Sequence, residues 1–366
     1  MSGTRPSIAT CTPVPFHANE TFFLRDTGLI CRELQNLGAA CRVIMPLPAH
    51  EDDLPTPDLL RVEPGKLKSA AWWHSQGLDA VILYSWGDPR YTRIARAIRK
   101  AGIRLIIHFD SSGELHEHLH RPGNRLFNRA KDVLVNTLRR LHLSYADIIT
   151  TSRPCVDSFS NDCYYGARIA AKCRLFPTPV DSCFRYNGAT KQDRIICAGS
   201  WQVPFKRAAV MMETLSMLLG QHPGVQADIC GTITPALQKW HTALPEQQRG
   251  RVHLHGLCTH EQLHRLYNAA SVVLCTSESE GSHTVSAEAM CCGCSVVCPP
   301  RPLLSVVRWY ASRNSGTVSR EDTPAQLTAA LLAELEKWQS GERNAAEIAA
   351  TWQPCFQVSH LAGWLR

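Results

Sequence analysis

Short apolar runs alternate with helical patterns along the whole chain. In the first half, five such runs predict strands at 8–11, 41–45, 79–84, 104–108 and 147–151. In the second half, six more predict strands at 194–198, 227–230, 251–255, 271–275, 295–298 and 316–319. Helical patterns fill the gaps, including 20–37, 208–219 and 261–269. Strands that alternate with helices in this way are typical of a parallel α/β fold.

A proline-containing break divides this pattern near the middle of the chain. Pro177 and Pro179 lie in the segment 176–181, and two prolines so close together resist both a helix and a central strand. The α/β pattern restarts after them, and a chain of 366 residues is long enough for two domains of ordinary size. We therefore predict two Rossmann-like, doubly wound parallel-sheet domains, 1–177 and 178–345, joined by this linker.

The composition is that of a globular protein, with 44% hydrophobic and 19% charged residues. No apolar stretch approaches the roughly 20 residues that a membrane-spanning helix needs. The first residues lack the long apolar region of a signal peptide, so we expect a cytoplasmic protein. The net charge of +7 is compatible with phosphorylated substrates or an anionic membrane surface, but it does not by itself indicate nucleic acid.

The 16 cysteines are dispersed through the α/β pattern, unlike the framework of a small disulfide-rich protein. Many lie in apolar runs, where a free cysteine packs as a small hydrophobe. The densest group comprises Cys291, Cys292, Cys294 and Cys298. It lacks the paired C-x-x-C spacing of a metal site, so we expect it to pack in the core.

The segment 277–290 carries the most specific chemical signal. It follows an apolar strand, has Gly281 at the predicted turn and then opens a helix. The first N–H groups of a helix are unpaired and lie at the positive end of its dipole, so such a turn can bind a diphosphate. Glu280 and Glu288 flank the turn with seven residues between them. Carboxylates at these positions can accept paired hydrogen bonds from a sugar or a ribose.

This segment resembles the E-x7-E signature of retaining glycosyltransferase family 4, whose members have the GT-B fold of two Rossmann-like domains facing across a cleft. The resemblance implies that Glu280 contacts the donor sugar and that Glu288 holds the ribose. Backbone N–H groups of the turn would contact the sugar and the phosphates, at Gly281, Thr284 and Val285. The residues that follow, 288–297, resemble the family's E-A-M-x-x-G-x-P-V-V, with serine in place of proline.

A second segment, 195–207, resembles the family's strand followed by G-R, a short loop and K-G. In the family, the Arg and the Lys neutralise the donor diphosphate and stabilise the leaving group. Lys206 occupies the Lys position, whereas Ser200 occupies the Arg position and Arg207 that of the glycine. Either Arg207 supplies the second positive charge from a new position, or stabilisation of the leaving group is weakened.

Weaker matches extend the resemblance to the rest of the chain. The linker resembles the family's I-P-N-G-V-D, and 346–366 resembles a C-terminal helix that crosses back to the N-terminal domain. The resemblance assigns donor binding to the second domain and acceptor binding to the first. There, His108 and Asp110 follow a predicted strand, where α/β proteins bind ligands, and we take both as candidate catalytic residues. A structural role in the core is the alternative for each.

The resemblance implies a hexosyltransferase that uses a UDP- or GDP-type nucleotide sugar as co-substrate, with retention of configuration and without a metal. The acceptor would be a hydroxyl of a glycan or a lipid-linked glycan, in cell-surface glycan or glycolipid assembly. Two alternatives on the same fold stay open: a sugar-nucleotide-binding protein with impaired catalysis, suggested by Ser200, and a sugar-nucleotide epimerase. An NAD oxidoreductase is disfavoured, because no G-x-G-x-x-G follows a predicted strand.

A rival motif is formed by His116, Glu117 and His120, which match the H-E-x-x-H signature of zinc peptidases. On an α-helix the two histidines would face one metal. Pro122 ends any such helix, however, and no glutamate lies close downstream as a third ligand. We therefore favour a polar loop over a zinc site.

The segment 121–140 combines basic and apolar side chains. Its basic residues are Arg121, Arg125, Arg129, Lys131, Arg139 and Arg140, and its apolar ones include Leu126, Phe127, Val133, Leu134 and Leu138. A basic amphipathic helix can lie on an anionic membrane surface or receive an acidic acceptor. The simpler interpretation, which we favour, is a helix whose apolar side packs in the core and whose basic side is solvated.

Overall fold

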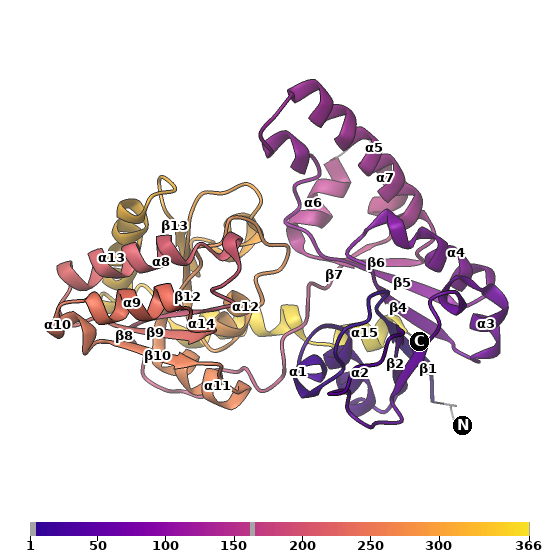
Figure 1. The fold of residues 1–366 in the computed structure, drawn as a ribbon, viewed down its shortest axis with the longest axis horizontal. Helices are drawn as coiled ribbons and strands as arrows, with labels where there is room; N and C mark the ends of the chain where they lie inside the picture. Colours follow the sequence, from indigo (N-terminus) through magenta and orange to yellow (C-terminus); the bar gives the residue numbers. More distant parts are fainter. Residues whose placement is uncertain (1–4, 162–164, 366) are drawn as a thin grey trace. The chain divides into compact units, whose positions relative to one another are not determined.

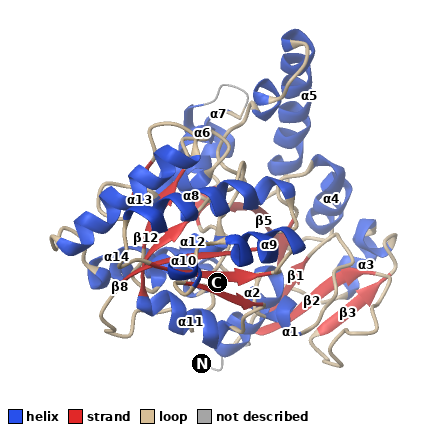
Figure 2. Cartoon of the chain, turned by 60° about the vertical axis from the view of Figure 1, so that its left-hand side comes forward, coloured by secondary structure: helices blue, strands red, loops and turns tan. Residues whose placement is uncertain are grey.

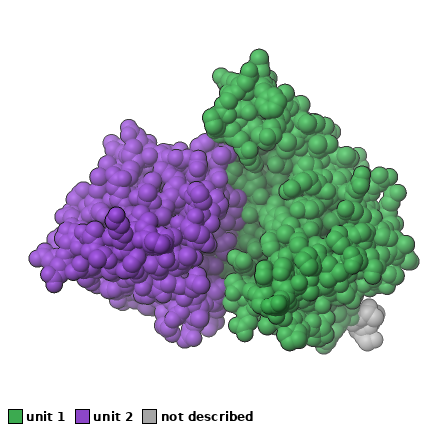
Figure 3. Space-filling view, viewed as in Figure 1, with its two compact units in different colours: residues 1–181, 357–366 green, residues 182–356 purple. Residues whose placement is uncertain are grey.

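The computed structural model describes residues 5–161 and 165–365, and the chain divides into two compact units (Figure 3). Unit 1 comprises residues 1–181 and 357–366, and unit 2 comprises residues 182–356. Each unit is built on a parallel sheet with helices packed on it (Figures 1 and 2). This confirms the prediction of two Rossmann-like parallel-sheet domains.

Seven strands form the sheet of unit 1, in the order β3-β2-β1-β4-β5-β6-β7. Their bounds are β1 Ser7–Cys11, β2 Ala40–Pro46, β3 Leu59–Val62, β4 Ala80–Tyr84, β5 Arg104–Phe109, β6 Ile148–Thr151 and β7 Cys173–Leu175. Five of them confirm predicted strands, whereas the edge strands β3 and β7 have no counterpart in the prediction. Both are short and only partly buried, so neither contains a long apolar run.

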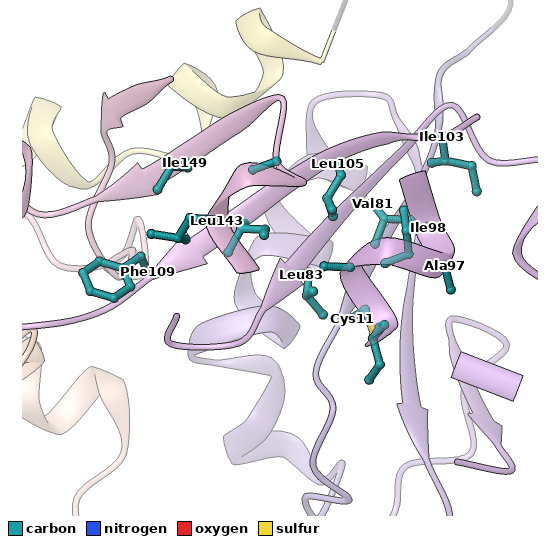
Figure 4. Close-up of a cluster of buried hydrophobic side chains, with 14 of the residues drawn as sticks. Cys11, Val81, Leu83, Ala97, Ile98, Ile103, Leu105, Phe109, Leu143 and Ile149 are labelled. Atoms are coloured by element: carbon teal, nitrogen blue, oxygen red, sulfur yellow. The ribbon is translucent and has the colours of Figure 1, made fainter. Parts of the chain in front are cut away.

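Successive residues of the central strands point into apolar clusters on opposite faces of this sheet. Leu105 and Ile107 of β5 belong to one cluster, and Ile106 to the other. Leu83 and Ile82 of β4 divide in the same way. Figure 4 shows the first cluster, with residues of β4, β5 and the helices packed on them. Because both faces are covered, the strands are continuously apolar, which is why they are recognisable in the sequence.

The α-helices of unit 1 are α1 Glu20–Phe23, α2 Asp26–Asn36, α3 Ala70–Ser75, α4 Thr92–Lys100, α5 Arg125–Ser144, α6 Arg153–Asn161, α7 Gly166–Ala170 and α15 Ser359–Trp364. Short 3-10 helices are η1 Lys66–Lys68, η2 Pro89–Tyr91 and η3 Glu117–His120. Within residues 5–161 and 165–365, no helix is both long and apolar enough to cross a bilayer.

The single helix predicted over 20–37 is wrong, because the chain breaks it into α1 and α2. Asp26, the first residue of α2, has a φ of 49°, in the left-handed region. Gly28 lies against α1, and a Cβ there would be 2.3 Å from the carbonyl oxygen of Phe22. Only glycine therefore fits at this position. The apolar periodicity runs through the break, so the pattern alone cannot reveal it.

The C-terminal segment packs on unit 1. Leu361 of α15 and Leu365 are buried in the same cluster as Phe176. The ring of Trp364 meets that of Phe176 edge on, with 6.4 Å between the ring centroids. The preceding helix α14, Ala345–Trp352, belongs to unit 2, so the chain returns to unit 1 after residue 356.

Six strands form the sheet of unit 2, in the order β10-β9-β8-β11-β12-β13. Their bounds are β8 Gln192–Gly199, β9 Gln226–Gly231, β10 Val252–Gly256, β11 Ala270–Leu274, β12 Ser295–Cys298 and β13 Gly316–Val318. All six confirm predicted strands. The α-helices are α8 Ala208–Gln221, α9 Pro235–Ala243, α10 Glu246–Arg249, α11 His260–Ala269, α12 Thr284–Cys291, α13 Pro324–Gln339 and α14. Short 3-10 helices are η4 Pro204–Lys206 and η6 Gln353–Phe356, and η5 Val306–Tyr310 is a π-helix.

The four closely spaced cysteines, Cys291, Cys292, Cys294 and Cys298, are free and buried around α12 and β12. The Cys294 thiol donates to the backbone carbonyl of Tyr267, with 3.0 Å between sulfur and oxygen. Burial raises the pKa of all four thiols, so they stay protonated at neutral pH. The prediction that these cysteines pack in the core is confirmed.

Candidate functional site

Two loops that follow neighbouring strands of unit 2 are held together by hydrogen bonds. Strands β8 and β11 are adjacent where the strand order of the sheet reverses. The Glu278 N–H in the loop after β11 donates to the Phe205 carbonyl in the loop after β8, over 2.7 Å. The Thr276 hydroxyl donates to the Lys206 carbonyl over 2.8 Å. Open α/β sheets bind ligands at this position, beyond the carboxyl ends of the strands.

Lys206 and Glu280 form an ion pair between these two loops. The Lys206 Nζ lies 2.6 Å from the Glu280 Oε1, and the side chains are 16% and 14% exposed. The Glu280 backbone is also fixed, because its N–H donates to the Leu303 carbonyl over 2.9 Å and its carbonyl accepts from the Ser305 N–H over 3.2 Å. The structure thus brings together two site residues that the sequence predicts from separate segments.

Helix α12 begins at Thr284, four residues after Glu280, with His283 as its N-cap. The His283 Nδ1 accepts a hydrogen bond from the Ser286 N–H over 3.3 Å. Burial lowers the pKa of His283 well below its usual value, and the positive charge of Lys206 acts in the same direction. The imidazole is therefore neutral. The predicted anion-binding residues lie at this helix start: Gly281 precedes the cap, and Thr284 and Val285 are the first helical residues, whose N–H groups lack intrahelical acceptors.

Glu288 lies on the second turn of α12 and is 9% exposed. The Tyr267 hydroxyl of α11 donates to its Oε2 over 3.0 Å. Burial raises the pKa of Tyr267, and the Glu288 charge raises it further, so the phenol stays protonated as a donor. Tyr267 is a site residue that the sequence analysis missed. Its helical pattern gives no signal of this contact, which depends on how α11 and α12 pack.

Arg207 has a charge partner of its own. Its φ is 57°, and its Nη1 lies 2.7 Å from the Asp322 Oδ1. Arg301 also pairs with Asp322, and its Nη1 lies 3.3 Å from the Glu278 Oε1. Ser200, at the position where the resembled family has arginine, is exposed. Asp322 and Arg301 come from distant loops and belong to no recognisable motif, so the sequence does not predict them as site residues.

His108 lies near the end of β5 in unit 1 and is buried. Its ring stacks on Tyr84, with 4.4 Å between the ring centroids, and its Nδ1 lies 3.1 Å from the Thr150 hydroxyl. Burial lowers the pKa of His108 to about 3, so the ring is neutral. Its Nε2 has no hydrogen-bond partner in the part of the chain that the structure describes. Asp110 follows β5 at the same edge of the sheet.

Two further polar residues lie beside His108. The Tyr84 hydroxyl is 3.1 Å from the Asp26 Oδ1 and 2.9 Å from the Thr178 Oγ1. Burial raises the pKa of Asp26, although the hydrogen bond from Tyr84 acts against it. Tyr84 ends a strand, so the strand-end rule that selects His108 could also have selected it. Asp26 gives no such signal, because it lies beyond the unpredicted break between α1 and α2.

The H-E-x-x-H segment does not form an α-helix. Glu117–His120 is a 3-10 helix, in which residues four apart do not share one face. His118, between the two motif histidines, has its Nδ1 2.6 Å from the Asp132 Oδ1. Within the described ranges, the motif residues do not form a group whose ligand atoms lie within 4.8 Å of one another. The geometry therefore disfavours the zinc-peptidase alternative and supports a polar loop.

Part of the chain matches a known protein family. Residues 192–337 match the family described as glycosyl transferases group 1. This segment lies in unit 2 and contains Lys206, Glu280 and Glu288. The search of curated protein sequences found no match to this chain.

Solved structures resemble almost the entire chain. HepE of Anabaena, in complex with UDP, is 14% identical over 98% of this chain and 98% of its own, with a TM-score of 0.67. Sucrose-phosphate synthase of Thermosynechococcus elongatus is 15% identical over 99% and 98%, with a TM-score of 0.65. WaaG, a glycosyltransferase involved in lipopolysaccharide biosynthesis, is 15% identical over 98% and 99%, with a TM-score of 0.62. The likeness shows the fold and confirms the predicted GT-B class.

Proposed function

We propose that this protein is a retaining glycosyltransferase that moves a hexose from a UDP- or GDP-type nucleotide sugar to a hydroxyl of a glycan or lipid-linked acceptor. The observation that carries the proposal is the ion pair between Lys206 and Glu280 at the start of α12, inside the segment that matches glycosyl transferases group 1. The proposed setting is cell-surface glycan or glycolipid assembly in the cytoplasm.

In this proposal, unit 2 binds the donor. The donor diphosphate accepts hydrogen bonds from the N–H groups of Thr284 and Val285, at the positive end of the α12 dipole. Glu288, which Tyr267 positions, holds the ribose. The acceptor is bound by unit 1, where His108 and Asp110 line the carboxyl edge of β5.

The ion pair suggests how donor binding prepares the site. A diphosphate competes with the Glu280 carboxylate for Lys206, because both are anions that the ammonium can pair with. Once Lys206 turns to the diphosphate, Glu280 is free to accept hydrogen bonds from hydroxyls of the donor sugar. One contact in the empty protein is thereby exchanged for two contacts with the donor.

The proposed reaction breaks the bond between the anomeric carbon and the diphosphate oxygen. The acceptor oxygen forms its bond to the same carbon from the same face, and its proton passes to the departing phosphate oxygen. Lys206 and the α12 N–H groups offset the negative charge that develops on the leaving nucleoside diphosphate. Because these groups supply the positive charge, we propose that the reaction needs no metal. Activity that excess EDTA abolishes and Mg²⁺ restores would overturn this part of the proposal.

A sugar-nucleotide-binding protein with impaired catalysis is the second candidate, and one observation favours it. Arg207 is paired with Asp322, so its positive charge is already offset within the protein. Because Ser200 occupies the position at which the resembled family has arginine, Lys206 is the cation that remains for the leaving group. Loss of one such charge typically costs about 3 kcal/mol of transition-state stabilisation, which slows the reaction without preventing donor binding.

A donor screen followed by a transfer assay tests both candidates. HepE structures contain UDP, UDP with glucose, and UDP-glucose, so UDP-glucose is the first donor to test, beside GDP and ADP sugars. We expect one nucleotide sugar to raise the melting temperature, because it binds only the folded state. We also expect release of the nucleoside diphosphate with glycan acceptors, with the anomeric configuration retained in the product by NMR.

Every other outcome either favours one of the alternatives or contradicts the proposed donor site. Stabilisation by a donor without nucleotide release on any acceptor favours the impaired binding protein. An isomerised donor in the absence of acceptor favours the epimerase. If no nucleotide sugar stabilises the protein, the proposed donor site is wrong.

A further inference from the structure

Helix α5 of unit 1 reverses the usual distribution of polar and apolar residues. Its buried residues are mostly polar: Asn128, Asp132, Asn136, His142 and Leu143. Its exposed residues include large apolar ones: Leu126 at 78%, Phe127 at 68%, Leu134 at 60%, Leu141 at 49%, Leu138 at 43% and Val133 at 37%. The prediction that the apolar side of this helix packs in the core is therefore wrong.

The buried side of α5 is attached to unit 1 by hydrogen bonds. The Asn136 amide donates to the Leu115 carbonyl over 2.7 Å and accepts from the Tyr165 hydroxyl over 2.7 Å. Asp132 accepts from the backbone N–H of His118 over 3.0 Å. These polar contacts, together with Leu143 in the core cluster of unit 1, hold the helix in place, so its exposed apolar side chains are not used in attaching it to the unit.

The exposed side of α5 is organised as a stripe with charged borders. At 100° per residue, Val133, Leu126, Leu141, Leu134, Phe127 and Leu138 fall within one continuous sector. Arg129 and Arg140 border this sector on one side and Lys131 on the other, and all three are exposed. Asp132, the acidic residue of the helix, faces inward. The outer side is therefore apolar along its middle, positive along both borders and free of acidic residues.

We propose that α5 docks the protein on the surface of an anionic lipid bilayer. The apolar stripe would enter the boundary between headgroups and acyl chains, and Arg129, Lys131 and Arg140 would lie at the lipid phosphates. Figures 1 and 2 show α5 extending beyond the rest of unit 1, so a flat surface can approach it. The proposal does not depend on the reaction proposed above.

The charges on α5 favour a bilayer over a second copy of the chain. A two-fold contact through this stripe would bring its cationic borders against the same borders of the other copy, and like charges repel. A bilayer that contains anionic lipids instead offers negative charge on both sides of the stripe. It also accepts exposed Leu and Phe side chains without requiring a matching surface.

Vesicle flotation of the full chain tests the proposal, with phosphatidylcholine vesicles compared with vesicles that also contain phosphatidylglycerol. We expect binding to the anionic vesicles that weakens as salt is raised. The double variant Leu134→Gln/Leu138→Gln should bind about tenfold more weakly, because two apolar anchors are lost. Arg129→Gln/Lys131→Gln should weaken binding to anionic vesicles by a similar factor. Leu257→Gln, at a residue of unit 2 that is 83% exposed, serves as the matched control and should bind as the parent does.

The positions are exposed, so all variants should keep the parent's melting temperature, and that measurement verifies the fold. The proposal is overturned if the parent chain does not float with anionic vesicles, or if the α5 variants float as well as the control. It is also overturned if light scattering shows a dimer that Leu134→Gln/Leu138→Gln converts to a monomer while vesicle binding is unchanged. That result would identify a second copy as the occupant of the stripe.

Discussion

The Lys206 ammonium lies 2.6 Å from the Glu280 carboxylate, although the two residues are 74 positions apart in the sequence. One follows β8 and the other follows β11, two strands that are neighbours in the sheet of unit 2. The pair holds a positive and a negative group at the start of α12, in a partly exposed position. Such a pair can be opened by a ligand that carries both phosphates and hydroxyls, and this makes it the first target for mutation.

Replacement of Lys206 by methionine should slow sugar transfer by about 100- to 1,000-fold, because the leaving diphosphate loses its cation. The methionine side chain is similar in length to that of lysine, so the fold should be retained. Initial rates with a saturating donor measure the effect. Lys239→Met, at an exposed lysine of the same unit, is the matched control and should have the parent rate. Equal rates for the two variants would remove Lys206 from the proposed mechanism.

Replacement of Glu288 by alanine should abolish the thermal stabilisation by the donor. The variant loses the proposed ribose ligand and the hydrogen bond from Tyr267. The empty protein should also unfold more easily, by about 1–3 kcal/mol, because the buried Tyr267 hydroxyl loses its acceptor. Melting curves with and without donor separate the two effects. Glu261→Ala, where the side chain is 80% exposed, should keep the full donor shift. A normal shift in the Glu288 variant would count against the assigned ribose site.

Replacement of Asp322 by asparagine should strengthen the binding of a nucleoside diphosphate. Asp322 pairs with both Arg207 and Arg301, so its neutralisation leaves two guanidinium groups without that counter-charge. We expect a gain of about 1 kcal/mol, or roughly fivefold in Kd, typical of a partly exposed ion pair. Calorimetric titration with UDP and GDP measures it. Asp157→Asn, which removes the partner of Arg153 in unit 1, should leave the Kd unchanged. A weaker affinity in the Asp322 variant would show that these arginines do not serve the diphosphate.

The free energy of unfolding should fall as the pH drops below about 6.5. Burial lowers the pKa of His108 to about 3, that of His142 to about 4 and that of His283 well below the ordinary value of 6.5. At pH values between each lowered pKa and 6.5, the unfolded chain binds protons that the folded chain does not. The free energy of unfolding is therefore highest above pH 6.5 and declines toward acid. At pH 5.5 the three histidines together should cost about 4 kcal/mol relative to neutral pH.

Urea unfolding at a series of pH values between 7 and 5.5 tests this effect. His108→Gln should remove about a third of the pH dependence, since one of these three buried histidines is gone. His360→Gln, at an exposed histidine, is the control for a general effect of histidine removal. If the His108 variant keeps the full pH dependence, the low pKa assigned to His108 is wrong.

The sequence by itself determined the two parallel-sheet domains and the segment around Glu280 and Glu288. The central strands are recognisable because helices cover both faces of each sheet, so their residues are continuously apolar. The turn at the start of α12 is also recognisable, because a strand, a glycine, a helix start and two carboxylates fall within a few residues. Such local patterns depend on backbone geometry that the neighbouring residues themselves specify.

Only the tertiary structure decided which partners the site residues have. Arg207 pairs with Asp322 across 115 positions, and Tyr267 reaches Glu288 because α11 packs beside α12. The periodicity of α5 reveals an apolar stripe, but not that the stripe faces outward. Its direction is set by Asn136 and Asp132, which bond to groups brought there by other segments. Contacts between distant segments depend on the packing of whole elements, and no local sequence pattern encodes that packing.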